Sequence, residues 1–279
     1  MAISILTNVT ALGIRNQLEK NSESITRSME RVASGRRINR AGDDAAGLAL
    51  ASLSEAKIRS AAQATRNTMD ALSFSQVAEG GMSEIDNLLV RMRELAIQGA
   101  SGTLGGNERT ALQIELGELV SEVDRLAKST KYFGTTLLDG QGKEFSYQIG
   151  VENDEASRIT YDGGLVDLRA NTLDLDELAL DDVDEARDSL TVIDEAISKV
   201  SVPRARLGGI QTRLHSIVHT LGNYSENMTA ALSRIRDADL AHETSEVVRS
   251  QILVRAASSV LAQANTLPLM ALDLLKGLG

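Results

Sequence analysis

The sequence predicts a mainly α-helical protein, a long antiparallel coiled-coil bundle with paired terminal helices and a small β-hairpin tip. Apolar residues recur at alternating steps of three and four along much of the 279-residue chain, which is the heptad pattern of packed helices. Hydrophobic residues make up 42% of the chain but aromatic residues only 3%, so a core must be built from aliphatic side chains that suit helix seams. Glycines gather at residues 99–106 and 134–164, where the helices should be interrupted.

The clearest helix is expected between Val183 and Ile235. Its apolar positions keep the three-four spacing for roughly seven heptads, and Arg204 is the one polar residue on the seam. A helix of this length would extend for about 80 Å at ~1.5 Å per residue, which a compact globule of this mass does not need. The pattern therefore favours an elongated bundle.

The first half of the chain supplies partners for this helix. We expect one helix from about residue 44 to 98, a reversal in the glycine-rich segment 99–106, and an antiparallel helix from about 107 to 130. The expected seams consist of Ala62, Thr65, Met69 and Leu72, then Met82, Ile85, Leu89, Met92 and Ala96, and in the second helix Leu112, Leu116, Leu119, Val123 and Leu126.

Both termini carry thinner apolar stripes. The N-terminal stripe repeats every seven residues, but Arg15 and Ser22 occupy its expected second apolar position. A helix pair with such stripes buries little surface and should be marginal alone, so we expect copies of the chain to complete the packing. Heterologous contacts of this kind give a ring or an open filament. The candidate polymerisation residues are Leu18, Ile25, Val32, Leu253, Val260, Leu267 and Leu274.

Residues 134–175 differ from the rest of the chain. Glycines punctuate short alternating runs such as Phe145 to Ile149, which predicts one or two β-hairpins, and Asp162-Gly163 is a dipeptide typical of hairpin turns. The acidic stretch 174–188 follows and should complement the N-terminal dipole of the long helix.

Charge and composition argue against several classes of function. The net charge of −10 disfavours nucleic acid and anionic membranes as partners, and residues 151–200 alone carry 15 acidic and 4 basic side chains. Without cysteine there is no disulfide, thiolate metal site or cysteine nucleophile. His215 and His219 share a helix face, but solvated side chains explain them better than a metal pair. We expect no catalytic residues, no metal and no cofactor.

Membrane insertion is also not expected. The most apolar stretch, residues 252–275, contains Arg255, Asp273 and Pro268, which argues against a helix exposed to lipid. The N-terminus has no Lys or Arg before Arg15, so it lacks the basic start of a cleaved secretory signal.

Motifs at both ends of the chain resemble those of bacterial flagellins and occur in the same order. They are SGRRIN at residues 34–39, DDAAGLA at 43–49, RMRELAIQ at 91–98, SRIRDAD at 233–239, QIL at 251–253 and VLAQAN at 260–265. The resemblance covers about residues 1–150 and 180–276.

The resemblance implies a structural subunit that polymerises into the extracellular flagellar filament for motility. Residues 1–42 and 233–279 would be inner-core helices. Residues 43–182 would hold outer-tube helices and the hairpins, with the outer variable domain nearly absent, and residues 183–232 the last outer-tube helix. The implied partners are other copies, other flagellin subunits, hook-associated and cap proteins, and the flagellar type III export apparatus with its chaperone.

The resemblance also implies a surface for the innate receptor Toll-like receptor 5. The positions that match the family's contact residues are Arg91, Leu95 and Glu115. The chain departs from the family at Val90, where receptor-activating members usually have Gln, and at Tyr132-Phe133-Gly134, where Phe-Asn-Gly is more common.

The sequence is also compatible with two alternative functions. A hook–filament junction protein would share the helical ends, and the number of copies per filament would separate it from a filament subunit. A secreted coiled-coil effector or enzyme with the hairpins as its active tip would stay monomeric under polymerising conditions.

Overall fold

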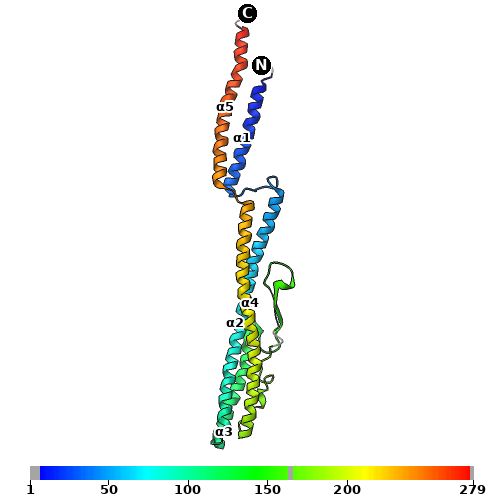
Figure 1. Ribbon diagram of the computed structural model, residues 1–279, viewed down its shortest axis with the longest axis vertical. Coiled ribbons are helices and arrows are strands. Elements are labelled where there is room, and N and C mark those ends of the chain that lie inside the picture. Colours follow the sequence, from blue (N-terminus) through cyan, green and yellow to red (C-terminus); the bar gives the residue numbers. More distant parts are fainter. Residues whose placement is uncertain (1–6, 163–165, 277–279) are drawn as a thin grey trace. The chain divides into compact units, whose positions relative to one another are not determined.

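The computed structural model describes residues 7–162 and 166–276, with side chains described up to Thr266 and not for Asp162. The helices are α1 (Val9–Ser34), α2 (Ala45–Gly99), α3 (Gly106–Ser129), α4 (Val183–Arg236) and α5 (Leu240–Lys276) (Figure 1). The strands are β1 (Lys131–Tyr132), β2 (Thr135–Thr136), β3 (Glu144–Gln148) and β4 (Arg158–Asp162). The mainly α-helical prediction is confirmed.

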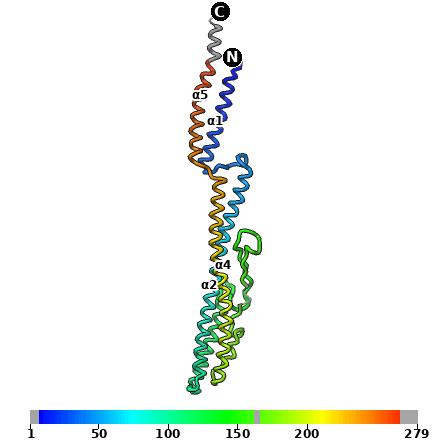
Figure 2. Tube along the Cα trace, in the orientation of Figure 1, coloured from blue at the N-terminus to red at the C-terminus, as the bar shows by residue number. Residues whose placement is uncertain are grey.

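The chain forms two compact units. The first combines residues 1–56 with 227–279 and contains α1 and α5, and the second spans residues 57–226 and contains α3 and all four strands. The trace in Figure 2 can be followed from blue to red through both units (Figure 2).

The core of the second unit follows the predicted seams. On α2 the predicted residues from Met82 to Met92 are 0% exposed, and on α3 Leu116 and Val123 are equally buried. On α4 every second seam position from Ala186 to Leu221 is buried, among them Ile193, Val200, Leu207 and Leu214. The positions between them are half-buried, so the heptad pattern identified the inward face of the helix.

The polar exception on the α4 seam has a partner. Arg204 is half-buried, and its guanidinium lies 2.9 Å from the Asp86 carboxylate of α2. This ion pair lets a charged side chain occupy a seam position without leaving an uncompensated charge at the helix interface.

One predicted seam is wrong by one residue. In the first part of α2 the buried side chains are Ala61, Ala64, Thr68 and Ala71, and Met69 is 51% exposed. Small residues on both sides of the true seam made two registers equally plausible. Packing selects the register in which the smallest side chains face the neighbouring elements, since these let the backbones approach closely.

A buried arginine closes the reversal between α2 and α3. Arg109 is 8% exposed, and its guanidinium donates to the carbonyl oxygens of Gly99 and, at 2.9 Å, of Ser101. These carbonyls lie at the C-terminal end of α2, where backbone acceptors lack partners within the helix and a positive charge complements the dipole. The glycines provide the turn, and Arg109 satisfies the acceptors that the turn exposes.

Two small antiparallel hairpins pack on this helical bundle, as predicted. β1 pairs with β2, and β3 pairs with β4 so that Phe145 lies opposite Tyr161. The ring of Phe74 on α2 is the centre of an aromatic cluster, with four rings at centroid distances of 4.9 to 5.8 Å. These rings belong to Tyr132, Phe145, Tyr147 and Tyr161. Edge-to-face and tilted contacts at such distances stabilise beyond simple area burial.

The predicted turn at Asp162-Gly163 is not the turn of this hairpin. Asp162 is the last residue of β4, and β3 is joined to β4 through residues 149–157. Gly163 lies outside the described residues. Further along, the backbone of Leu178 and Leu180 pairs with the side-chain amide of Gln113 on α3 at 3.1 and 2.7 Å, which fixes the acidic segment before α4.

The turn between β1 and β2 has an unusual residue. Phe133 and Gly134 form a two-residue loop in which both φ angles are positive, at 45° and 81°. This is the pattern of a type I′ turn, which favours Asn-Gly. A bulky residue in the left-handed region costs about 1–2 kcal/mol. The Phe133 ring is nevertheless 92% exposed, and the Tyr132 ring lies 4.6 Å from it.

The aromatic cluster predicts a dependence of stability on alkaline pH. Burial raises the pKa of Tyr147 to about 12 from its usual value of 10, with further contributions from Tyr132 and Asp70. The folded state therefore holds the phenol proton more tightly than the unfolded chain does. This stabilisation is present below pH ~10 and is lost as the pH rises toward ~12.

Urea unfolding between pH 9 and 12 tests this expectation. The unfolding free energy of the wild type should fall more steeply over this range than that of Tyr147→Phe, which has no phenol proton. Tyr224→Phe is the matched control, because it removes a phenol that lies outside the aromatic cluster. Parallel curves for the wild type and Tyr147→Phe would contradict the argument.

The first unit is built on antiparallel helices α1 and α5, which lie side by side (Figure 1). The Asn8 amide donates to the Ala264 carbonyl at 2.9 Å near one end, and Arg31 pairs with Glu243 at 3.1 Å near the other. Helix α1 ends at Ser34, earlier than the boundary at residue 42 expected from sequence, because Gly35 adopts a left-handed φ of 68°.

The segment after α1 is a structured loop. The Asp43 carboxylate accepts the backbone N–H groups of Asn39 and Arg40 at 3.1 Å, and these bonds lower the pKa of that carboxyl. The Arg37 N–H also donates to the carbonyl of Arg236 at the end of α4. The motif at residues 34–44 thus forms a loop within the first unit.

Candidate functional site

The interface between α1 and α5 has polar residues at its centre. On α1 the buried side chains are Asn21 and Ser28, and on α5 they are Glu243, Ser250 and, near its far end, Ala264. Helical spacing places the second seam position of α1 at Ile14, Asn21 and Ser28, so the expectation of Arg15 and Ser22 there was wrong by one residue. Buried polar residues in a two-helix seam contribute register more than stability.

The predicted polymerisation residues fall into two groups in the structure. Leu18, Ile25 and Val32 are half-buried on the face of α1 that meets α5. Leu253 and Val260 of α5 are 44% and 51% exposed. The side chains of Leu267 and Leu274 lie outside the described residues.

The outer surface of α5 is apolar well beyond the predicted stripe. Val248 and Ile252 are 54% and 61% exposed, in addition to Leu253 and Val260. A single heptad line does not include these two, because the exposed face of α5 is wider than one line. The α1–α5 pair thus buries polar groups at the centre of its interface and leaves aliphatic side chains of α5 exposed, unlike an independent soluble hairpin.

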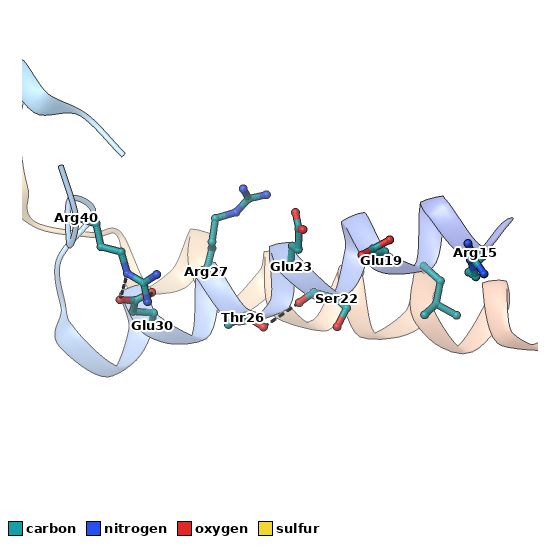
Figure 3. Close-up of a pocket in the computed structure, with 9 residues that line it drawn as sticks. Arg15, Glu19, Ser22, Glu23, Thr26, Arg27, Glu30 and Arg40 are labelled. Carbon is teal, nitrogen blue, oxygen red and sulfur yellow. Dashed lines mark hydrogen bonds and ion pairs between the residues drawn. The ribbon is translucent and has the colours of Figure 1, made fainter. Parts of the chain in front are cut away.

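The outer surface of α1 is charged instead. Arg15, Glu19, Glu23 and Arg27 follow one another at one-turn intervals along an open groove of about 850 Å³, whose floor includes Leu18 (Figure 3). Within the described part of the chain no ion pair or hydrogen bond joins these four, although Glu30, further along the groove, pairs with Arg40 at 3.0 Å. The outer faces of the two terminal helices thus differ in chemistry, one apolar and one charged.

This arrangement supports association rather than catalysis. An exposed aliphatic face on a helix pair with a polar seam gains stability when another chain covers it, because that contact removes apolar surface from water. The apolar face belongs to α5 and the charged groove is lined by α1 and Arg40, so copies that use both would meet through unlike surfaces. Unlike surfaces generate open assemblies instead of closed dimers.

The second predicted site lies in the other unit. Arg91 on α2 reaches Glu115 on α3 with an N–O distance of 2.7 Å and Glu94 with one of 2.9 Å. Their side chains are between 45% and 60% exposed, so the three groups form an accessible charged surface. The hydrogen bonds to Glu115 and then Glu94 raise the pKa of the Arg91 guanidinium above its usual value.

Leu95 does not belong to that surface. Its side chain is 1% exposed and packs in the core with Met92 and Leu116. The predicted trio is therefore corrected to a surface pair, Arg91 and Glu115, above a buried leucine. Sequence spacing alone could not show this, because Leu95 lies close enough to both the inner and the outer face of α2 to fit either.

The described residues contain no group of three or more His, Asp or Glu side chains able to hold a metal ion. His215 and His219 both lie exposed on α4. Over the same residues, no helix has the length and apolarity needed to cross a membrane.

Two regions of the chain, one toward each end, match known protein families. Residues 5–143 match the bacterial flagellin N-terminal helical region, and residues 190–275 match the bacterial flagellin C-terminal helical region. A flagellin of Halalkalibacterium halodurans is 39% identical over 269 residues, covering 96% of this chain and 98% of that protein. The flagellar filament 33 kDa core protein of Treponema phagedenis is 36% identical over 282 residues with the same coverage of both chains.

A solved structure of a putative flagellar hook-associated protein from Vibrio parahaemolyticus shows a similar fold, with a TM-score of 0.58 and 16% identity. The match covers 70% of this chain and 100% of that chain, and at this identity it concerns the fold alone. The two family regions together span most of the sequence, and the Halalkalibacterium halodurans relative matches it almost from end to end. The chain therefore belongs to the bacterial flagellin family.

Proposed function

We propose that this protein is the structural subunit of a flagellar filament and polymerises through its terminal helices. The observation that carries the proposal is the burial pattern of the α1–α5 pair. Its interface buries the polar residues Asn21, Ser28 and Ser250, while the aliphatic Leu253 and Val260 stay exposed. Family membership supports the same conclusion, since relatives that match nearly the whole chain are flagellins and filament core proteins. The role is structural and requires no cofactor.

The proposed layout is the one that the resemblance to flagellins implies. The terminal segments 1–42 and 233–279 form the inner core of the filament, and segments 43–182 and 183–232 form the surrounding layer with the hairpins. The filament lies outside the cell. Export proceeds through the flagellar type III apparatus with a chaperone and without a cleaved signal peptide. Other flagellin subunits and the hook-associated and cap proteins would meet the same terminal helices.

Electron microscopy of the purified protein after seeding tests the main proposal. Long filaments that account for most of the protein are expected. A chain that remains monomeric under every polymerising condition would refute it. Assembly limited to short rings or junction-sized oligomers would favour the hook–filament junction alternative, which shares the fold.

Arg91 and Glu115 support a second proposal, recognition by Toll-like receptor 5. This exposed pair should contribute little to stability, because solvent screens surface ion pairs. Arg91→Ala and Glu115→Ala are therefore expected to leave the fold intact and to reduce receptor-reporter signalling at least several-fold.

The matched control is Arg125→Ala on α3, which breaks a comparable exposed pair with Glu122. Unfolding midpoints of all three variants should stay close to that of the wild type. Signalling that is equal for wild type, Arg91→Ala and Glu115→Ala would remove the receptor proposal and leave the filament proposal untouched.

A further inference from the structure

One aromatic residue of the second unit projects from the surface of its own chain. Phe133 has a left-handed φ of 45° and is 92% exposed, and its ring lies at the edge of the aromatic cluster, 4.6 Å from that of Tyr132. The turn would form more readily with Asn at this position. A residue that is both strained and exposed is unfavourable in the free chain on two counts, so a compensating contact outside the chain is the physical explanation to test.

The same unit also contains a pocket lined by both apolar and polar side chains. It has a volume of about 650 Å³ between β4 and α4, and Tyr161, Val166 and Leu207 in its lining are each 8% exposed or less. Val202 also lines it and is 67% exposed. Arg206 is a polar member of the lining, and a guanidinium interacts favourably with the face of an aromatic ring. The pocket therefore offers apolar contacts and a cation to an aromatic side chain.

We propose that Phe133 of one copy inserts into the Tyr161–Val166–Leu207 pocket of a second copy. A projecting residue and a receptive pocket at different places on one chain make a heterologous contact, and such contacts build open polymers instead of closed dimers. The inference rests on the proposed filament function and adds to it an interface of the second unit, separate from the terminal helices.

The absence of cysteine permits a direct test by cross-linking. Lys131→Cys is next to the turn on the exposed edge of β1, and Val202→Cys lies in the pocket lining, so Phe133 itself is kept. After seeded assembly of the full chain, a short bifunctional maleimide should convert the double variant into a ladder of covalent oligomers. Each single-cysteine variant can give covalent dimers at most.

Adding Phe133→Asn to the double variant should weaken the ladder several-fold. Filaments that form normally but give no ladder, or a ladder that Phe133→Asn leaves unchanged, would overturn the inference. If the wild type itself forms no filaments, the failure belongs to the proposed function instead, so the two outcomes are distinguishable.

Phe133→Asn alone gives a second, independent readout. Relief of the strained turn should raise the thermal unfolding midpoint of the monomer, while loss of the contact should raise the critical concentration for assembly several-fold. A residue with a purely structural role would move both properties together. An unchanged critical concentration beside a raised midpoint would refute the contact.

Discussion

Val260→Asp is expected to abolish filament formation while the second unit stays folded. Val260 is 51% exposed on α5, so an aspartate there remains solvated in the free chain and has little effect on its fold. In an assembled filament the same carboxylate would be covered by apolar side chains, and burial of an unpaired charge is very costly. We expect the critical concentration to rise by at least tenfold. Electron microscopy and sedimentation measure it directly.

The matched control is Val260→Thr, which keeps the shape of valine and adds no charge. It should assemble at a critical concentration much closer to that of the wild type. Near-UV circular dichroism should show the same folded second unit in all three proteins. Normal filaments from Val260→Asp would contradict the assignment of this face to assembly.

Arg109→Ala should produce the largest loss of stability in the second unit. The substitution removes the guanidinium donor of the Gly99 carbonyl and leaves the Ser101 carbonyl with the longer bond from the Leu104 N–H at 3.5 Å. A hydrogen bond to a charged group contributes about 1.5–3 kcal/mol, so the loss of both should lower the unfolding free energy by about 3–6 kcal/mol. Chemical denaturation of the full chain, followed by circular dichroism, gives the value.

Two further variants separate geometry from charge. Arg109→Lys keeps the positive charge but lacks the planar fork that reaches both carbonyls, so it should fall between wild type and Arg109→Ala. Arg125→Ala removes an exposed arginine from the same helix and should have little effect on the unfolding free energy. If Arg109→Ala and Arg125→Ala lower the unfolding free energy equally, the two hydrogen bonds of the buried Arg109 guanidinium do not contribute measurably to stability.

Sequence periodicity predicted the helices well because long heptads constrain one face strongly. The seam of α4 was predicted correctly from Ala186 to Leu221, and Arg204 at a seam position was explained once Asp86 was found opposite it. Further along, Leu232 is buried and the predicted Ala231 is only half-buried. The prediction failed where side chains are small. Ala61 and Ala64 could be exchanged for their neighbours in the pattern, and the register was settled by packing that the sequence does not display.

The candidate sites show the same division. The apolar stripe on α5 was predictable, but its exposure was not. Periodicity identifies an apolar helix face but does not show whether that face packs against α1 or is exposed to solvent in the free chain. Leu95 illustrates the opposite error, since a motif placed it on a surface and the structure buries it. The strained turn at Phe133 depends on a backbone angle, which composition and spacing do not encode.

The distribution of aromatic residues makes the two units spectroscopically distinguishable. All seven Phe and Tyr residues lie between residues 57 and 226, and the chain has no Trp. Near-UV dichroism and tyrosine fluorescence therefore report on the second unit alone, and α1 and α5 are invisible to both. Far-UV dichroism sees every helix. A subunit joining a growing polymer should thus change its far-UV spectrum if the terminal helices gain order, and a single sample carries separate optical signals for the folding of one unit and the ordering of the other.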